Sequence, residues 1–183
     1  MVTTAVAAAL LAGCSSGPKA SVGSPDTAAQ VTTTQQTPPP VHKTTTTLPT
    51  IPVGSARPLN VADGVGGVAQ VFVSRVQTAT VEPGELGSTP SRGLYVVFYV
   101  KAVGAQGSMD VSPYDFYQVS ADGAHVSDTA YAPAWGTELD TATLQPGENI
   151  TGVLVYDVSP KGAHGKLVYS PLMATRPIGQ WIY

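Results

Sequence analysis

The sequence predicts an all-β fold, an antiparallel β-sandwich that begins only after a long N-terminal extension. Three observations support this prediction. The 183 residues include 19 Gly and 16 Pro, and so many turn-forming residues favour turns and strands over helices. From Arg57 onward, short runs of β-branched and aromatic residues alternate with turn residues, which is typical of successive strands. About seven such runs follow one another without a helical pattern between them, as in a sandwich.

The N-terminal residues 1–13 predict a lipoprotein signal peptide. Val2 to Leu11 is apolar but far shorter than the roughly 20 residues that a membrane-spanning helix needs, and it ends in small residues, as signal peptides do. The run Leu11-Ala12-Gly13-Cys14 resembles the lipobox of bacterial lipoproteins, which implies cleavage before Cys14 and a diacylglycerol thioether on its sulfur. No Lys or Arg precedes Cys14, so we expect the translation start to lie further upstream.

Cys14 is the only cysteine of the chain. A single cysteine excludes an intramolecular disulfide and a structural zinc site built on several cysteines. Lipidation is therefore the predicted use of this residue, and Cys14 is the predicted membrane anchor.

Residues 14–56 predict a disordered stalk. The segment is dominated by Thr, Ser, Pro, Gln and Ala, and it includes the runs Pro38 to Pro40 and Thr44 to Thr47. It offers too little apolar surface to offset the entropy of ordering the chain. Its proline run favours an extended chain and the remainder a flexible one. Dense Thr and Ser beside Pro also resemble O-glycosylated stalks, with an unmodified spacer as the alternative.

Two long strands are predicted early in the folded domain, which we place at residues 57–183. Residues 68–78 alternate between apolar and polar side chains, with Val71, Val73 and Val76 among the apolar ones, and this pattern predicts a half-buried strand. Residues 94–100 are almost continuously apolar and too short to span a bilayer, so they predict a central strand of a packed sheet.

The later strands are predicted from turn signals. Asp122-Gly123 best accommodates the positive φ angles of a tight hairpin, so the flanking residues 114–120 and 124–127 are expected to pair antiparallel. Further strands are predicted at 149–158, 166–170 and 180–183.

Four segments together resemble a known type of domain. These are GLYVV (93–97), PYDF (113–116) with Asp122-Gly123 after it, LQPGE (144–148) and GVLVYDV (152–158). In this order they resemble the DUF4352 type of immunoglobulin-like domain, which is carried by bacterial surface lipoproteins and is similar to the MPT63-like secreted domains of mycobacteria. The resemblance covers about residues 58–183. It implies an immunoglobulin-like β-sandwich on a mycobacterial or other actinobacterial lipoprotein, and it implies no particular activity.

Metal and catalytic sites are not predicted. Asp122, His125 and Asp128 are closely spaced, with Asp110 and Asp115 upstream, but the hairpin turn accounts for Asp122 without a metal ion, and strand alternation does not bring the others onto one face. The histidines lack a neighbouring nucleophile motif of the Gly-x-Ser-x-Gly kind. We therefore expect no cofactor, no metal and no enzymatic activity.

The candidate binding residues are large amphipathic aromatic side chains near predicted loops. Tyr131, Trp135, Trp181 and Tyr183 would form a patch for a glycan, a lipid or a protein if they are exposed together. The alternative is that they close the ends of the core.

Composition limits the partners of the chain. A formal net charge of −3 leaves no basic surplus for nucleic acid. We expect a binding or interaction module on the extracytoplasmic face of the cell membrane, held there by the lipid anchor, with an envelope protein, glycan or lipid as partner. One alternative is a carrier with an apolar ligand between its sheets, which needs an internal cavity. Another is an envelope hydrolase, which needs a nucleophile hydrogen-bonded to a general base.

Overall fold

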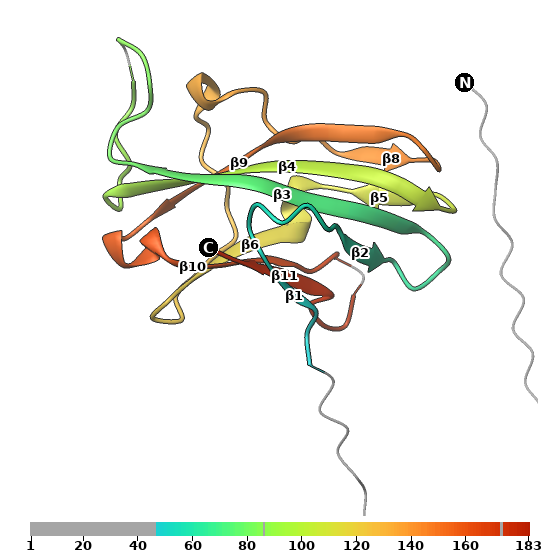
Figure 1. Cartoon of the computed structure of the whole chain (residues 1–183). Helices are drawn as coiled ribbons and strands as arrows, with labels where there is room; N and C mark the ends of the chain where they lie inside the picture. Colours follow the sequence, from blue (N-terminus) through green and yellow to red (C-terminus); the bar gives the residue numbers. More distant parts are fainter. Residues whose placement is uncertain (1–46, 86, 173) are drawn as a thin grey trace, which may run out of the picture. The chain divides into compact units, whose positions relative to one another are not determined.

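The computed structural model describes residues 47–85, 87–172 and 174–183 (Figure 1). Two β-sheets pack face to face, which confirms the predicted all-β sandwich. Residues 1–46 lie outside the described residues, and with them the predicted signal peptide 1–13, the predicted anchor Cys14 and most of the predicted stalk. Within the described part of the chain, no helix has the length and apolar character needed to cross a membrane.

The upper sheet in Figure 1 has four antiparallel strands in the order β2-β3-β4-β9. They are β2 (Leu59–Ala62), β3 (Val68–Ala79), β4 (Leu94–Gln106) and β9 (Asn149–Val158). The strands predicted at 68–78, 94–100 and 149–158 are thus confirmed. β4 is longer than predicted because alternation of buried and exposed residues continues beyond its apolar run.

The lower sheet has five strands in the order β1-β11-β10-β6-β7. They are β1 (Thr50–Pro52), β11 (Gly179–Ile182), β10 (Gly165–Tyr169), β6 (Phe116–Ser120) and β7 (His125–Val126). β6 and β7 form the predicted hairpin, with Gly123 at φ 87°. A further antiparallel pair joins β5 (Met109–Val111) to β8 (Ala142–Leu144).

The predicted boundary between stalk and domain at residue 56 is wrong. β1 lies within the predicted stalk, yet it pairs in parallel with β11, and its Ile51 packs against the core. The Val53 N–H also donates to the Ile182 carbonyl. A Thr/Pro-rich composition concealed this strand, because Pro52 is tolerated on an edge strand where no ladder bond is required of it.

The start of the predicted strand 114–120 is also different. Residues Pro113–Asp115 form a 3₁₀ turn, η1, ahead of β6. Ser112 and Asp115 form a reciprocal capping box, in which the Ser112 N–H donates to the Asp115 carboxylate at 2.9 Å. Pro113 fits the first position of such a turn, so the chain enters the strand only at Phe116.

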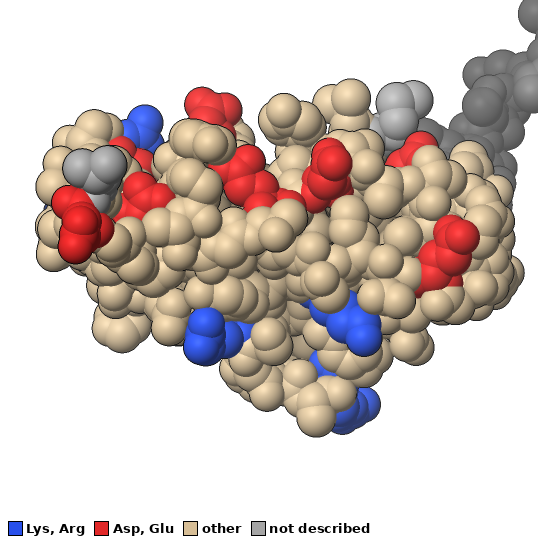
Figure 2. All heavy atoms as spheres, turned by 90° about the horizontal axis from the view of Figure 1, so that it is seen from above, with Lys and Arg blue, Asp and Glu red and all other residues tan. Residues whose placement is uncertain are grey.

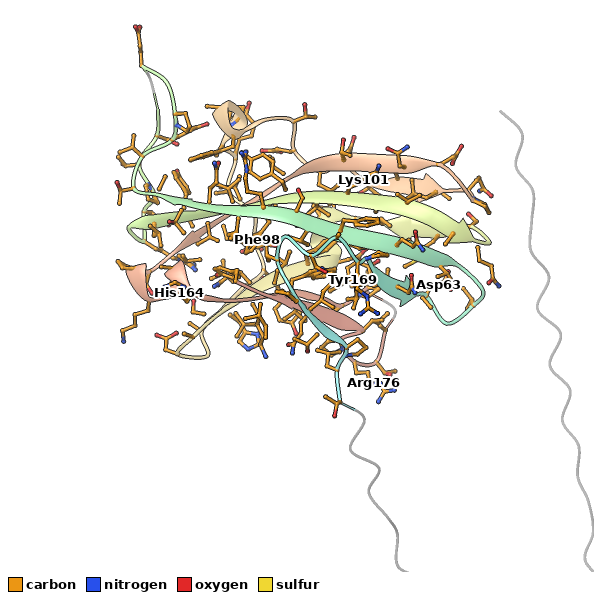
Figure 3. All side chains as sticks on the ribbon, in the orientation of Figure 1. Asp63, Phe98, Lys101, His164, Tyr169 and Arg176 are labelled. Carbon is orange, nitrogen blue, oxygen red and sulfur yellow. The ribbon has the colours of Figure 1, made fainter. Side chains whose placement is uncertain are left out.

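Aromatic side chains from both sheets fill the space between them. Phe98 from β4 lies 4.9 Å, centroid to centroid, from the C-terminal Tyr183, and Phe116 lies 4.9 Å from Tyr169. Figure 3 shows Phe98 and Tyr169 in this interior. Trp181 is fully buried there. Packed aromatic residues therefore fill the space between the two sheets. A surface site is found instead on the outer face of the four-stranded sheet, which points away from this core.

Candidate binding groove on the outer face of the four-stranded sheet

The outer face of the four-stranded sheet carries a second apolar cluster. Strand alternation turns Tyr95, Val97, Val153 and Val155 away from the main core, yet each is at most 5% exposed. The outer face of an antiparallel sheet is commonly solvated. Here the loop of residues 128–140 covers part of it instead, and the cluster is the result.

Hydrogen bonds to the free edge of β9 hold this loop in place. The Ala130 N–H donates to the Val155 carbonyl at 2.7 Å. Farther along, the Leu139 N–H donates to the Val153 carbonyl at 3.0 Å, and the Val153 N–H donates to the Thr137 carbonyl at 2.9 Å. These bonds occupy the edge of β9 that β4 leaves free, so both arms of the loop are attached to the sheet.

Gly152 allows the second arm to approach β9 closely. A Cβ atom at this position would lie 2.4 Å from both the Cα and the N of Leu139 and 2.8 Å from the carbonyl carbon of Glu138. Real Cβ contacts are longer than this. The close contact of this arm with β9 therefore requires glycine at position 152.

The tip of the loop is fixed by a buried carboxylate. A short 3₁₀ helix, η2 (Pro133–Trp135), forms the tip, and its Ala134 N–H donates to Glu82 at 2.8 Å. The Ser88 hydroxyl donates to the same carboxylate at 2.8 Å. The hydrogen bond from Ala134 is the main cause that lowers the pKa of Glu82 below its ordinary value, and the bond from Ser88 adds to this effect. The ionised Glu82 thus joins the β3–β4 connection to η2.

A groove of about 640 Å³ lies beside η2 on the exposed part of the sheet face. We call it the outer groove, and its volume falls within the range of about 300–1,000 Å³ typical of ligand sites. Its floor comes from β3, β4 and β9, and its wall from residues 135–137. The lining residues are Phe72, Ser74, Tyr99, Val100, Lys101, Trp135, Gly136, Thr137, Thr151, Gly152 and Val153.

Two rows of side chains cross three strands on this face, and all of their members except Arg75 line the groove. One row is Phe72, Lys101 and Thr151, and the other is Arg75, Tyr99 and Val153. Adjacent strands lie about 4.8 Å apart, so each row spans about 10 Å. The rows therefore present aromatic, cationic and hydroxyl groups side by side on one face.

A β-bulge after Val73 brings Arg75 into the second row. Ala69, Val71 and Val73 face the core, and strict alternation would turn Arg75 inward after them. The register shift between Val73 and Arg75 inserts one extra residue, Ser74, and turns Arg75 outward. Its guanidinium then lies 4.0 Å from the centroid of the Tyr99 ring. Such a cation–π contact stabilises both side chains by about 0.5–1 kcal/mol at exposed sites.

The hydroxyl of Tyr99 connects the floor to the wall of the groove. It donates to Gln77 Oε1 at 3.1 Å and lies 3.4 Å from the Trp135 carbonyl oxygen. Trp135 packs against the outer apolar cluster and is partly exposed. The aromatic parts of floor and wall therefore form one supported surface.

Charge is unevenly distributed around the outer groove. Among the described residues that line it, Lys101 is basic and none is acidic. Figure 2 shows the molecule from above, with acidic side chains gathered mainly over the upper half of the view and most of the basic ones over the lower half. Lys101 is labelled in Figure 3 on the upper sheet.

The predicted aromatic patch is wrong as a set of four residues. Trp181 is fully buried, and Tyr183 packs against the core, where its hydroxyl accepts from Gln118 Nε2 at 2.7 Å and donates to the Gly162 carbonyl at 2.9 Å. β11 is paired to strands on both sides, which carries its alternate side chains into the interior. Tyr131 is 79% exposed. Trp135 is the member that lines the outer groove.

Four of the residues weighed for metal binding, Asp110, Asp115, Asp122 and His125, make other contacts in the structure. Within residues 47–85, 87–172 and 174–183, no three His, Cys, Asp or Glu side chains come together. Asp122 lies 3.8 Å from Lys161 Nζ, and the His125 ring stacks on Tyr117. Asp110 accepts from the Thr143 hydroxyl, and Asp115 belongs to the capping box. These contacts are structural.

Phe72, Arg75, Tyr99 and Lys101 were not among the residues singled out from the sequence. One signal pointed to them: the apolar positions Val71, Val73 and Val76 break the two-residue period between 73 and 76. Such a break indicates a bulge. It would have placed Arg75 on the same face as Phe72, whereas the facing residues Tyr99 and Lys101 depend on the register between β3 and β4.

Comparison with known proteins agrees with the sandwich fold. No protein-family model and no curated protein sequence matches this chain. Among solved structures, a secreted protein from Mycobacterium tuberculosis, MPT63, is similar with a TM-score of 0.57 and 23% sequence identity, over 75% of this chain and 98% of that one. The yjhA protein from Bacillus subtilis has a TM-score of 0.47 and 19% identity, over 70% of this chain and 86% of its own. The likeness to MPT63 shows a shared fold, and the domain is an MPT63-like β-sandwich.

Proposed function

We propose that this chain is a lipid-anchored module of the bacterial cell envelope that binds an envelope component through the outer groove and catalyses no reaction. The observation that carries this proposal is the groove itself. It combines a partly exposed aromatic wall at Trp135 with an aromatic floor at Phe72 and Tyr99. The β9 edge bonds and Glu82 hold the wall in place before any ligand arrives. Preformed sites of this kind lose little entropy on binding.

The proposed location rests on the N-terminal sequence. Leu11-Ala12-Gly13-Cys14 has the lipobox pattern, and a Thr/Pro-rich segment follows before β1 begins at Thr50. MPT63, which shares the fold, is a secreted protein. A lipidated Cys14 would hold a DUF4352-type immunoglobulin-like domain at the extracytoplasmic face, with the outer groove free to meet other envelope components.

The two alternative functions have less support. A carrier needs an apolar cavity between the sheets, but that space is occupied by contacts such as Phe98 with Tyr183, and the groove lies on the other side of the sheet. A hydrolase needs a nucleophile that is hydrogen-bonded to a general base. Of the two histidines in the described part of the chain, His125 is exposed and stacks on Tyr117, and His164 is exposed. The groove favours the binding module.

The anchor is tested by the chemistry of Cys14. We expect mass spectrometry of the protein purified from membranes to find a diacylglycerol thioether on Cys14 as the first residue. The Cys14→Ser variant should leave the membrane fraction, and a Ser15→Ala variant, as matched control, should stay in it. An unmodified Cys14, or a Cys14→Ser protein that stays membrane-bound, would refute the anchor.

The groove is tested on intact cells with a photo-crosslinking amino acid. Placed at Phe72, in the groove, it should capture an envelope component. Placed at Ile182, which is 53% exposed on β11, it should not. Capture from position 72 should disappear when Trp135→Ala is added. Equal capture from both positions, or capture that Trp135→Ala leaves unchanged, would exclude the outer groove as the binding surface.

A further inference from the structure

We infer that the ligand of the outer groove is an anionic glycan, a sugar chain that carries carboxylate or phosphate groups. This inference rests on the proposed function and names the class of its ligand. It is drawn from the charge, the shape and the hydrogen-bonding groups of the groove.

Charge is the first argument. The chain as a whole is acidic, with 12 Asp and Glu against 9 Lys and Arg. The outer groove has the opposite character, because Lys101 stands in the middle of its floor. Arg75 lies beside the groove, on the strand position that faces Tyr99. No carboxylate is among its described lining residues. A negatively charged ligand is therefore attracted to this part of an otherwise acidic surface.

The arrangement of aromatic and hydroxyl groups is the second argument. Phe72 and Trp135 offer ring surface, on which the C–H face of a sugar ring packs, whereas one face of the Tyr99 ring is covered by Arg75. Thr137 and Thr151 lie among them, and their hydroxyls can both donate and accept hydrogen bonds, as sugar hydroxyls do. The Ser74 hydroxyl also lines the groove and can accept, since it already donates to the Tyr99 carbonyl at 3.4 Å. A site of apolar platforms with a few polar groups between them fixes the orientation of such a ligand.

The shape of the groove disfavours the other ligand classes. A peptide bound by strand addition needs a free sheet edge, but next to the groove the edge of β9 is occupied by Ala130 and by residues 137–139. A lipid chain would need enclosure on most sides, whereas this floor is an open sheet face. A sugar chain can lie across the two rows with one face packed and its other face in water.

Arg75 adds a second cation beside the groove, and its contact with Tyr99 restrains it. Arg75 stacks on Tyr99, so its guanidinium is held over the ring at 4.0 Å. The ring in turn is held by the Gln77 amide oxygen. A guanidinium held in one place loses less entropy on binding an anion than a free side chain does.

The test is calorimetric titration of the full chain carrying Cys14→Ser, with probes that differ in one property each. Oligogalacturonate supplies an anionic sugar chain, and its methyl ester supplies the same sugars without the charge. Oligophosphomannan supplies phosphate in place of carboxylate. Poly-glutamate supplies an anionic peptide, and phosphatidylglycerol vesicles supply an anionic lipid surface. Binding should occur with either or both anionic sugar chains and should be at least about tenfold weaker with the methyl ester.

Variants locate the binding. Lys101→Glu should weaken binding of the anionic glycan at least about tenfold. Lys161→Glu changes the net charge by the same amount but lies on η3 (Pro160–Ala163), which contributes no residue to the groove. The affinity of this control variant should stay within about twofold of the wild type. Trp135→Ala should abolish binding and Trp135→Phe should retain part of it. Both variants must keep the wild-type far-ultraviolet circular dichroism for the comparison to count.

Three results would overturn the inference. The first is that the methyl ester binds as tightly as the charged sugar chain, and the second is that Lys101→Glu and Lys161→Glu weaken glycan binding equally. The third is that poly-glutamate or the vesicles bind more tightly than either sugar chain, in a way that depends on Lys101. No binding of any sugar probe would also reject the glycan, while groove-dependent capture on intact cells would still support the proposed function. Loss of that capture as well would reject both.

Discussion

Replacing Gly152 with Ala should release the wall of the outer groove from the sheet. The added Cβ would lie 2.4 Å from the backbone of Leu139, about 1 Å closer than an ordinary contact. The atoms that it would meet are backbone atoms of Glu138 and Leu139, so no side chain can rotate to make room. The arm of residues 137–139 must move away from β9.

The structure allows an estimate of the cost. Moving the arm breaks its two hydrogen bonds with Val153, at about 0.5–1.5 kcal/mol each. Overpacking adds about 1–3 kcal/mol unless the arm detaches fully. We expect the free energy of unfolding to fall by about 2–4 kcal/mol, and the melting temperature by roughly 10 °C. Asn149→Ala, an exposed change in the same strand, should shift the free energy by less than about 0.5 kcal/mol.

Two assays read this prediction. Urea unfolding followed by circular dichroism gives the free energy of unfolding, and amide hydrogen exchange reports the Leu139 and Val153 N–H groups directly. We expect both amides to exchange faster in Gly152→Ala, while the amides paired between β3 and β4 keep their protection. Unchanged exchange at Leu139 and Val153, together with unchanged stability, would refute the close approach of loop and strand.

The remaining predictions concern the core and the loop clamp. Tyr183→Phe should cost about 1–2 kcal/mol in urea unfolding, because it removes bonds at 2.7 and 2.9 Å. Tyr156→Phe should instead raise the free energy of unfolding by about 1 kcal/mol, because the Tyr156 hydroxyl is buried with no hydrogen-bond partner in the described part of the chain; a loss equal to that of Tyr183→Phe would contradict this. Trp181→Ala should cost about 3–5 kcal/mol and Tyr131→Ala less than about 0.5 kcal/mol, and similar values for the two would contradict the separation of buried and exposed members of the predicted patch. The pKa of Glu82 is lowered in the folded state, so the stability that the ionised carboxylate contributes is complete above the ordinary pKa of about 4.5 and is lost as the pH falls through the folded-state pKa. Glu82→Gln should therefore flatten the acid side of a plot of melting temperature against pH. An unchanged slope would show that the Glu82 carboxylate does not stabilise the fold.

Much of the fold could be predicted because its strands are local patterns. Residues 149–158 are rich in β-branched and aromatic residues and follow the Pro146-Gly147 turn, and they form β9 with the predicted bounds. Asp122-Gly123 marks its hairpin through the positive φ of a glycine. Short strands such as β1 and β2 were not predicted, because three or four residues carry too little periodicity and gain their stability from partners distant in sequence.

The candidate site was only partly predictable for the same reason. Trp135 could be identified as an aromatic residue in a Pro-containing loop. That Trp181 is buried depends on the strands that flank β11, which no local pattern reveals. The groove floor requires the β3 bulge and the registers Arg75 to Tyr99 and Tyr99 to Val153. Pairings between strands far apart in the chain are set by the whole sheet.

The measurement that tests the central claim most directly is mapping of backbone amide chemical shifts. The ¹⁵N-labelled chain carrying Cys14→Ser is titrated with solubilised envelope extract from the cells that produce it. We expect shifts concentrated at Phe72, Tyr99, Val153 and the 135–137 wall, and their loss in Trp135→Ala. Shifts confined to β10 and β11, or a groove pattern unchanged by Trp135→Ala, would contradict the assignment of the outer groove as the binding site.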